Sequence, residues 1–89
     1  MSILVDECQV WPNGNGLWCH MMSDIQGPAG LAELHAMADT IGMSRSWFQD
    51  KPRHPHYDLR PSKRALAIAA GAEAVTSNEL VRRCIPSTP

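Results

Sequence analysis

The chain of 89 residues is short enough for one domain, and its 44% hydrophobic and 19% charged residues are typical of a folded protein. The formal net charge of −1 lacks the basic excess that binding to duplex nucleic acid requires, so we expect no duplex partner. We expect one domain over residues 1–85 and a flexible tail over residues 86–89.

The three cysteines give no sign of a disulfide framework. Cys8, Cys19 and Cys84 are an odd number without CxxC spacing, so we expect free thiols in a reducing cytoplasm. The first residues hold no long apolar run of the kind a signal peptide has, and no stretch approaches the roughly 18 apolar residues of a membrane helix. We therefore expect a soluble cytoplasmic protein with no membrane partner. Its low net charge and small core leave a homodimer open.

The first 23 residues predict two strands that pair as a hairpin. Residues 2–5 form a short apolar run with β-branched members, and residues 17–23 alternate between two faces. In the second strand, Cys19 would lie on one face and His20 on the other. Between the strands, residues 11–16 (WPNGNG) contain two Asn-Gly pairs, which favour a turn.

Residues 30–43 (GLAELHAMADTIGM) are the clearest helix in the sequence. Apolar side chains recur there at helical spacing and form one stripe, and His35 lies at the margin of that stripe. Gly42 suits the left-handed residue that ends a helix. Residues 46–49 then predict a third short strand.

The C-terminal half predicts two helices around a last short strand. Residues 50–61 contain three prolines and predict a loop. We expect a helix that begins at residue 62, with Ser62 as its cap, and stops at Gly71, then a strand over residues 73–76. A final helix over residues 76–84 would open on a Thr-x-x-Glu capping box. The order β-β-α-β-α-β-α indicates a small single-domain α/β fold, with a mixed sheet and the helices packed on it.

The stretch from His54 to Ala72 gathers the groups best suited to chemistry. His54 and His56 lie two apart before Asp58, and alternate residues of an extended segment share a face. Imidazoles and carboxylates are the usual ligands of zinc, manganese or iron, although no HExxH motif is present. We expect a zinc or manganese site, if there is one, to use His20, His35, His56 and Asp58. The alternative is that the histidines are hydrogen-bonded boundary residues or solvated.

The same stretch also predicts an anion site. Lys63 and Arg64 fall in the first turn of the expected helix, where backbone N–H groups and the helix dipole attract anions. A phosphate loop of the GxxxxGK[ST] kind is absent, and the opposing interpretation is a solvated first turn that Asp58 neutralises. The predicted ligand-binding residues are His20, His35, His56, Tyr57, Lys63 and Arg64.

Two further groups of residues allow alternatives. The aromatic residues Trp11, Trp18, Trp47 and Tyr57, with arginines nearby, could stack nucleobases, or they could be core and interface anchors. Asp6 stands at the end of a predicted strand, where it could join a carboxylate site for metal-dependent cleavage or act as a turn residue. The candidate catalytic residues are His56, Asp58 and Asp6.

An ordered series of segments resembles a domain-of-unknown-function family of small proteins common in bacteriophage and bacterial genomes. The segments are ILVDE, WCHMMSD, ELHAMADTIGM, WFQ, HYDL, SKRALAIAAGA and NELVRR, which together span roughly residues 2–83. The resemblance implies a compact, phage- or prophage-associated domain in the host cytoplasm, and it supplies no activity. The links at residues 25–30 and 50–55 are longer here than in the family pattern, and His54 lies in the second of them. A shared site would carry over to His20, Asp24, His35, His56, Tyr57, Asp58, Lys63 and Arg64, with Asp6 next.

Three hypotheses on function follow from these patterns. The first is a protein that binds an anionic small molecule, a nucleotide or phosphorylated metabolite, in a pocket of histidines, Tyr57 and Arg64. The second is a metal-assisted hydrolase or nuclease that uses the same His/Asp cluster. The third is an interaction module that inhibits a host protein through a surface rich in Trp and Met.

Overall fold

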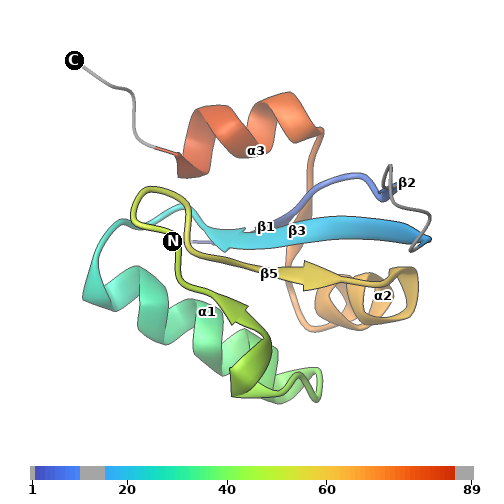
Figure 1. Ribbon diagram of the computed structural model, residues 1–89, viewed down its shortest axis with the longest axis horizontal. Helices are drawn as coiled ribbons and strands as arrows, with labels where there is room; N and C mark the ends of the chain where they lie inside the picture. The colour runs from blue at the N-terminus through green and yellow to red at the C-terminus, as the bar shows by residue number, and fades with distance from the viewer. Residues whose placement is uncertain (1, 11–15, 86–89) are drawn as a thin grey trace.

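The computed structural model describes residues 2–10 and 16–85, which form a mixed sheet with helices on both faces (Figure 1). Helix α3 covers one face, and helices α1 and α2 cover the other. The expected small α/β domain is thus confirmed. Most of the predicted turn over residues 11–16 and the predicted tail over residues 86–89 lie outside the described residues.

The sheet is built mainly on the two strands that the sequence predicts as a hairpin. Its members are β1 (Ile3–Val5), β2 (Gln9–Val10), β3 (Leu17–Ser23), β4 (Phe48–Gln49), β5 (His56–Leu59) and β6 (Glu73–Ala74). The spatial order is β4-β5-β3-β1-β6, and β2 pairs with β3 beside β1. The β1 and β6 pair is parallel and the other pairs are antiparallel, so the sheet is mixed.

The three helices begin and end close to the predicted residues. Helices α1 (Pro28–Thr40) and α2 (Pro61–Ala69) each have proline in the first turn, where its fixed φ suits the helix and no N–H is needed. Helix α3 (Ser77–Cys84) begins as predicted, because the Thr76 hydroxyl accepts a hydrogen bond from the N–H of Glu79 at 3.1 Å. Gly42 follows α1 with a φ of 78°, the left-handed conformation expected of it.

The prediction of Ser62 as a helix cap is wrong. The helix begins at Pro61, so Arg60 takes the capping position and Ser62 lies inside the first turn. Within residues 2–10 and 16–85, no side chain forms a capping hydrogen bond to this helix.

The predicted loop over residues 50–61 is also wrong in its second half. Residues His56–Leu59 form β5, which lies inside the sheet between β4 and β3. Prolines 55 and 61 flank this strand without interrupting it, so every residue of β5 keeps its N–H for the ladder. The strand predicted over residues 46–49 is shorter than expected, because a 3₁₀ turn (Arg45–Trp47) takes its first half and leaves β4 only two residues.

Strand alternation divides the apolar side chains between two cores. Cys19 and Met21 of β3 pack with Tyr57 of β5 in the larger core, beneath α1 and α2. Met22 points the opposite way, into a smaller core beneath α3. Since side chains alternate along a strand, His20 lies on the α3 face of the sheet, as the sequence predicts. None of the described helices is long and apolar enough to cross a membrane.

A close approach between α1 and the preceding loop fixes one position as glycine. Gly30 is buried in α1, and a Cβ atom there would lie 1.8 Å from the carbonyl oxygen of Ile25. We expect Gly30→Ala to lower the free energy of unfolding by about 2 kcal/mol, because this clash exceeds the helix propensity gained. Urea unfolding measures the change, with the exposed Ala32→Gly as a control that costs about 1 kcal/mol. A Gly30→Ala variant as stable as the wild type would contradict this packing.

Candidate functional site

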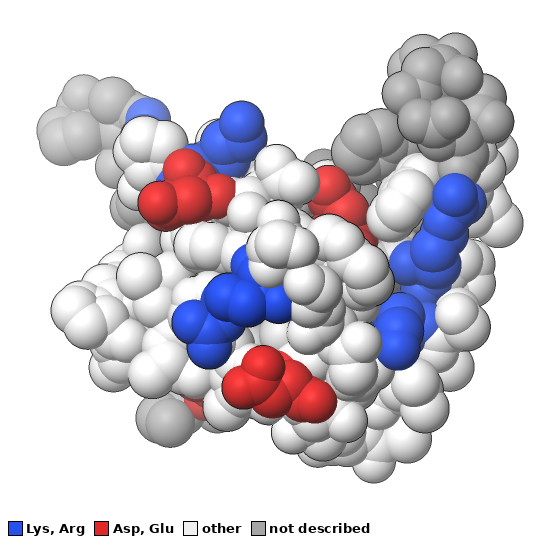
Figure 2. Space-filling model, turned by 60° about the horizontal axis from the view of Figure 1, so that its bottom comes forward, with Lys and Arg blue, Asp and Glu red and all other residues white. Residues whose placement is uncertain are grey.

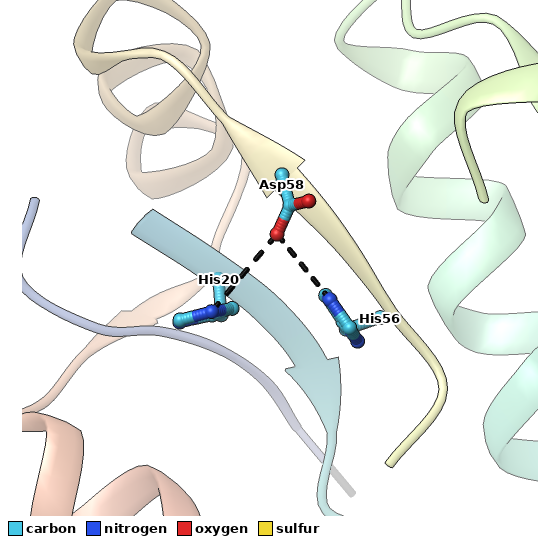
Figure 3. A group of neighbouring side chains, drawn as sticks. All are labelled: His20, His56 and Asp58. Carbon is cyan, nitrogen blue, oxygen red and sulfur yellow. Dashed lines mark ion pairs between the residues drawn. The ribbon is translucent and has the colours of Figure 1, made fainter. Parts of the chain in front are cut away.

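Three polar side chains converge on the face of the sheet that carries α3. His20 projects from β3, and His56 and Asp58 project from β5 (Figure 3). His20 and Asp58 are directly opposite each other in the register of the two strands, and His56 is two residues from Asp58 on the same face. The three residues, called the His–His–Asp triad below, are thus brought together by strand pairing alone.

The atoms of the triad are close enough to share one ion. The Oδ1 atom of Asp58 lies 3.3 Å from Nε2 of His56 and 4.0 Å from Nε2 of His20. One ligand atom from each residue lies within 4.8 Å of the other two. Ligands at about 2.0–2.2 Å from a tetrahedral ion lie about 3.4 Å apart, so a small inward movement of the side chains would complete the geometry.

Both imidazoles are held by the nitrogen that faces away from the triad. Nδ1 of His20 lies 3.0 Å from Oδ2 of Asp6, and Nδ1 of His56 lies 2.8 Å from the carbonyl oxygen of His54. Because a carboxylate and a carbonyl only accept, each Nδ1 is the donor. In the neutral rings, the lone pair is therefore on Nε2 and faces Asp58. An outer carboxylate or carbonyl that orients a histidine in this way is the usual support of a metal ligand.

Asp58 is the third member and has an uncompensated oxygen. Its Oδ1 atom is buried and accepts no hydrogen bond, although Nε2 of His56 is only 3.3 Å away. In the tautomer that donates from Nδ1 to the His54 carbonyl, Nε2 of His56 carries no hydrogen to donate to this oxygen. Buried polar atoms are almost always paired, and among the described residues this is the side-chain atom that is not.

Asp6 holds His20 in place from behind. It follows β1 directly and lies opposite His20, where its N–H donates to the His20 carbonyl oxygen at 3.2 Å, as in an ordinary ladder. The N–H of His20 donates instead to Oδ1 of Asp6 at 2.6 Å. The hydroxyl of Ser77, at the start of α3, donates to Oδ2 of Asp6 at 3.1 Å. Arg64 donates through Nε to the backbone carbonyl oxygen of Asp6 at 2.7 Å. Asp6 thus lies outside the triad and positions it.

The Asp6–His20 pair shifts the pKa of both groups. Burial by itself would raise the pKa of Asp6, but the hydrogen bonds from His20 and Ser77 outweigh it and hold the pKa below its ordinary value of 3.8. The hydrogen bond to Asp6 raises the pKa of His20 above 6.5, against the smaller opposing effect of burial. Asp6 is therefore ionised at neutral pH and binds the Nδ1–H of His20 as a charged acceptor.

His35 and Tyr57 do not join the triad, and the predicted pocket of His20, His35, His56, Tyr57 and Arg64 is wrong in this respect. Tyr57 alternates with His56 and Asp58 along β5, so it points to the opposite face, into the larger core. There its hydroxyl lies 2.7 Å from Nδ1 of His35, whose ring packs edge-on against Phe48. Burial lowers the pKa of His35. The buried Tyr57 thus hydrogen-bonds a half-buried His35 at the margin of the larger core.

The two cations predicted to bind an anion are engaged with the backbone. Lys63 donates through Nζ to the carbonyl oxygen of Ile41 at 2.8 Å, and Arg64 binds the carbonyl of Asp6. Asp24 lies at the far end of β3, where it accepts from the N–H of Ser2 and pairs with Arg83. The residues expected to form one site therefore divide among separate places, and only the triad gathers.

Two supporting groups of the triad were not predicted from the sequence. One is the carbonyl oxygen of His54, and the other is the hydroxyl of Ser77. A backbone carbonyl has no signature in a sequence, and Ser77 is 71 residues away from Asp6 in the chain. The His-x-Asp spacing of β5 is the signal that was available, once the segment is recognised as a strand.

Comparison with known proteins gives one match. The family model described as "Protein of unknown function (DUF4031)" matches residues 3–87, nearly the whole chain. The chain belongs to this family. The match confirms the resemblance that the ordered segments indicate, and the triad and Asp6 all lie within the DUF4031 domain. No curated protein and no solved structure matched the sequence.

The Asp6–His20 pair predicts a stability that depends on pH. We expect Asp6→Asn to lower the free energy of unfolding by about 2 kcal/mol near pH 5, where Asp6 is ionised and His20 is protonated. Because the folded pKa of Asp6 is depressed, the wild type loses this advantage as pH falls through that pKa. Because the folded pKa of His20 is raised, the stability that the protonated imidazole contributes is lost as pH rises through that pKa. Urea unfolding at about pH 3, 5 and 8 tests this, and a difference that stays constant with pH would contradict the pairing.

Proposed function

We propose that this protein is a metal-assisted hydrolase whose divalent metal ion is bound by the His–His–Asp triad. The observation that carries the proposal is the convergence of two Nε2 lone pairs on the buried, unpaired Oδ1 of Asp58. A divalent cation at their centre would satisfy all three atoms at once, and it would compensate the buried negative charge. This is the second of the hypotheses that the sequence raises, with His35 removed from the ligand set.

The number of ligands supports catalysis over a structural role. Structural zinc sites are closed by four protein ligands, whereas catalytic sites use three and leave a position for water or substrate. Two histidines and one carboxylate are also the facial set that binds iron(II) and related ions with open positions. Zinc and manganese are the ions that we expect in the triad, and both support hydrolysis.

The hydrogen bonds made by Nδ1 of His20 and of His56 support a role of both rings as metal ligands. Asp6 is ionised and holds His20 by a charge-assisted hydrogen bond, which raises the basicity of Nε2 as a ligand. The ion would lower the pKa of a bound water to near neutrality, so that it loses one proton to solvent and attacks as hydroxide. The triad sits on rigid strands, which hold the attacking water in a fixed place relative to a substrate.

Substitution of a single ligand tests metal binding. We expect the purified, chelator-treated protein to bind zinc or manganese with one-to-one stoichiometry in isothermal titration calorimetry. His56→Ala should weaken this binding by about 100-fold or more, because only two ligands remain. His54→Ala is the matched control, since it removes a nearby imidazole and keeps the carbonyl that orients His56. Wild-type protein that binds neither ion, or equal losses in the two variants, would contradict the proposal.

The unpaired oxygen of Asp58 predicts an opposite effect on stability. Without metal, the buried Oδ1 atom of Asp58 accepts no hydrogen bond. We therefore expect Asp58→Asn to leave the free energy of unfolding of the metal-free protein unchanged or to raise it by about 1 kcal/mol. In excess zinc the order should reverse, because only the wild type gains stability from binding. Thermal unfolding with and without zinc measures both. An Asp58→Asn variant that is less stable than wild type without metal would indicate a purely structural carboxylate.

A further inference from the structure

A cleft of about 460 Å³ opens beside the triad, along the edge of β5. It exists because β4 is only two residues long and pairs with His56 and Tyr57, so the edge of β5 from Asp58 onward meets no strand of the described residues on that side. Its walls include Trp18, Trp47, Gln49, Asp58, Arg60 and Lys63, and it is called the edge cleft below. The volume is that of a site for a small molecule. Asp58 belongs to both the cleft and the triad, so a ligand in the cleft reaches the triad through this residue.

The walls of the edge cleft combine cations with flat apolar surface. The guanidinium of Arg60 lies 4.2 Å from the centre of the Trp18 ring, and Trp47 is 53% exposed. Lys63 uses one of its three donors on the Ile41 carbonyl. Among the described residues neither cation forms an ion pair with a carboxylate. Figure 2 shows a column of Lys and Arg side chains along the end of the molecule that holds α2.

We propose that the edge cleft binds the substrate, a nucleoside monophosphate, with its base against Trp47 and its phosphate between Arg60, Lys63 and the triad. Indoles stack on any nucleobase, and a guanidinium binds phosphate oxygens in pairs. Both chemistries are present in one cavity that contains a triad residue. The hydrolytic role of this ligand rests on the proposed function, but its binding in the cleft does not.

The reaction on this substrate is a simple hydrolysis. The oxygen of a water supplied by the ion would form a bond to phosphorus, and the bond from phosphorus to the nucleoside oxygen would break. One proton of the water stays on the phosphate, and the other reaches the departing oxygen through solvent. Arg60 and Lys63 would stabilise the charge on the phosphate oxygens during the displacement.

Titration of the chelator-treated protein separates the cleft from the metal. Adenosine 5′-monophosphate and cytidine 5′-monophosphate are added while ¹H–¹⁵N spectra follow the indole signals of Trp18 and Trp47. We expect both nucleotides to bind with Kd of about 1 mM or below, and adenosine or ribose 5-phosphate at least about tenfold more weakly. No shift with either nucleotide would overturn the inference. Ribose 5-phosphate that binds as tightly as the nucleotides would overturn the role of the base.

Two arginine variants sharpen the test. Arg60→Gln should weaken binding of adenosine 5′-monophosphate about tenfold and leave adenosine binding unchanged, because it removes only the contact to phosphate. Arg82→Gln, on the exposed face of α3 and outside the cleft, is the matched control and should change neither. Equal affinity of wild type and Arg60→Gln for the nucleotide would overturn the placement.

Activity of the metal-loaded protein tests the role as substrate. Protein loaded with zinc or manganese should release inorganic phosphate from adenosine 5′-monophosphate, and Asp58→Asn should abolish the release. Loaded protein that binds the nucleotide without releasing phosphate would overturn its role as substrate. Failure of the metal titration, with nucleotide binding intact in metal-free protein, would instead overturn the proposed function and leave the cleft as a nucleotide site.

Discussion

The buried carboxylate of Asp6 is the interaction on which the rest of the structure depends. Its two oxygens receive the backbone N–H and ring N–H of His20 and the hydroxyl of Ser77, while its own carbonyl receives Arg64. These contacts tie the end of β1 to β3, α3 and α2. A buried charge is tolerated only where such donors surround it, so the helices and strands must meet at this point for the chain to fold. The same contacts fix the ring of His20, and through it one corner of the triad.

Asp58 shows the opposite arrangement, in which a buried oxygen is left without a donor. Among the described residues, the fold supplies four hydrogen bonds to Asp6 and none to Oδ1 of Asp58, which lies on the other side of His20. A buried oxygen that accepts no hydrogen bond lowers stability, and a ligand that binds this oxygen compensates the loss. The proposed metal ion accounts for this contrast, and it also accounts for the outward-facing contacts of both imidazoles.

Much of the fold could be predicted from local patterns, because those patterns are decided by neighbouring residues. Alternation placed Cys19 and His20 on opposite faces of β3, and a capping box marked the start of α3. The strand β5 was missed because its prolines suggest a loop, and whether they flank or interrupt a strand depends on where the partner strand pairs. His56 and Tyr57, which are adjacent on β5, were for the same reason assigned to one pocket. In the structure Tyr57 points into the core beside His35, and His56 points to the triad.

The composition of the site was predictable in part. His20, His56 and Asp58 are among the expected metal ligands, and the sequence could not indicate that His35 lies on the other side of the sheet, since this depends on which face α1 covers. The role of Asp6 depends on the register of β1 against β3. It also depends on the hydrogen bond that its carbonyl oxygen accepts from Arg64, 58 residues away in the chain. Pairings of this kind are set by the whole fold. The phage association and a host-protein partner stay predictions.

The most direct test of the central claim is a crystal structure of the protein grown with zinc and measured at the zinc absorption edge. The account predicts one strong anomalous peak, about 2.0–2.2 Å from Nε2 of His20, Nε2 of His56 and Oδ1 of Asp58. Density for water or a buffer anion at the remaining position would mark the open site. A peak elsewhere on the molecule, or none at this place at saturating zinc, would contradict the account.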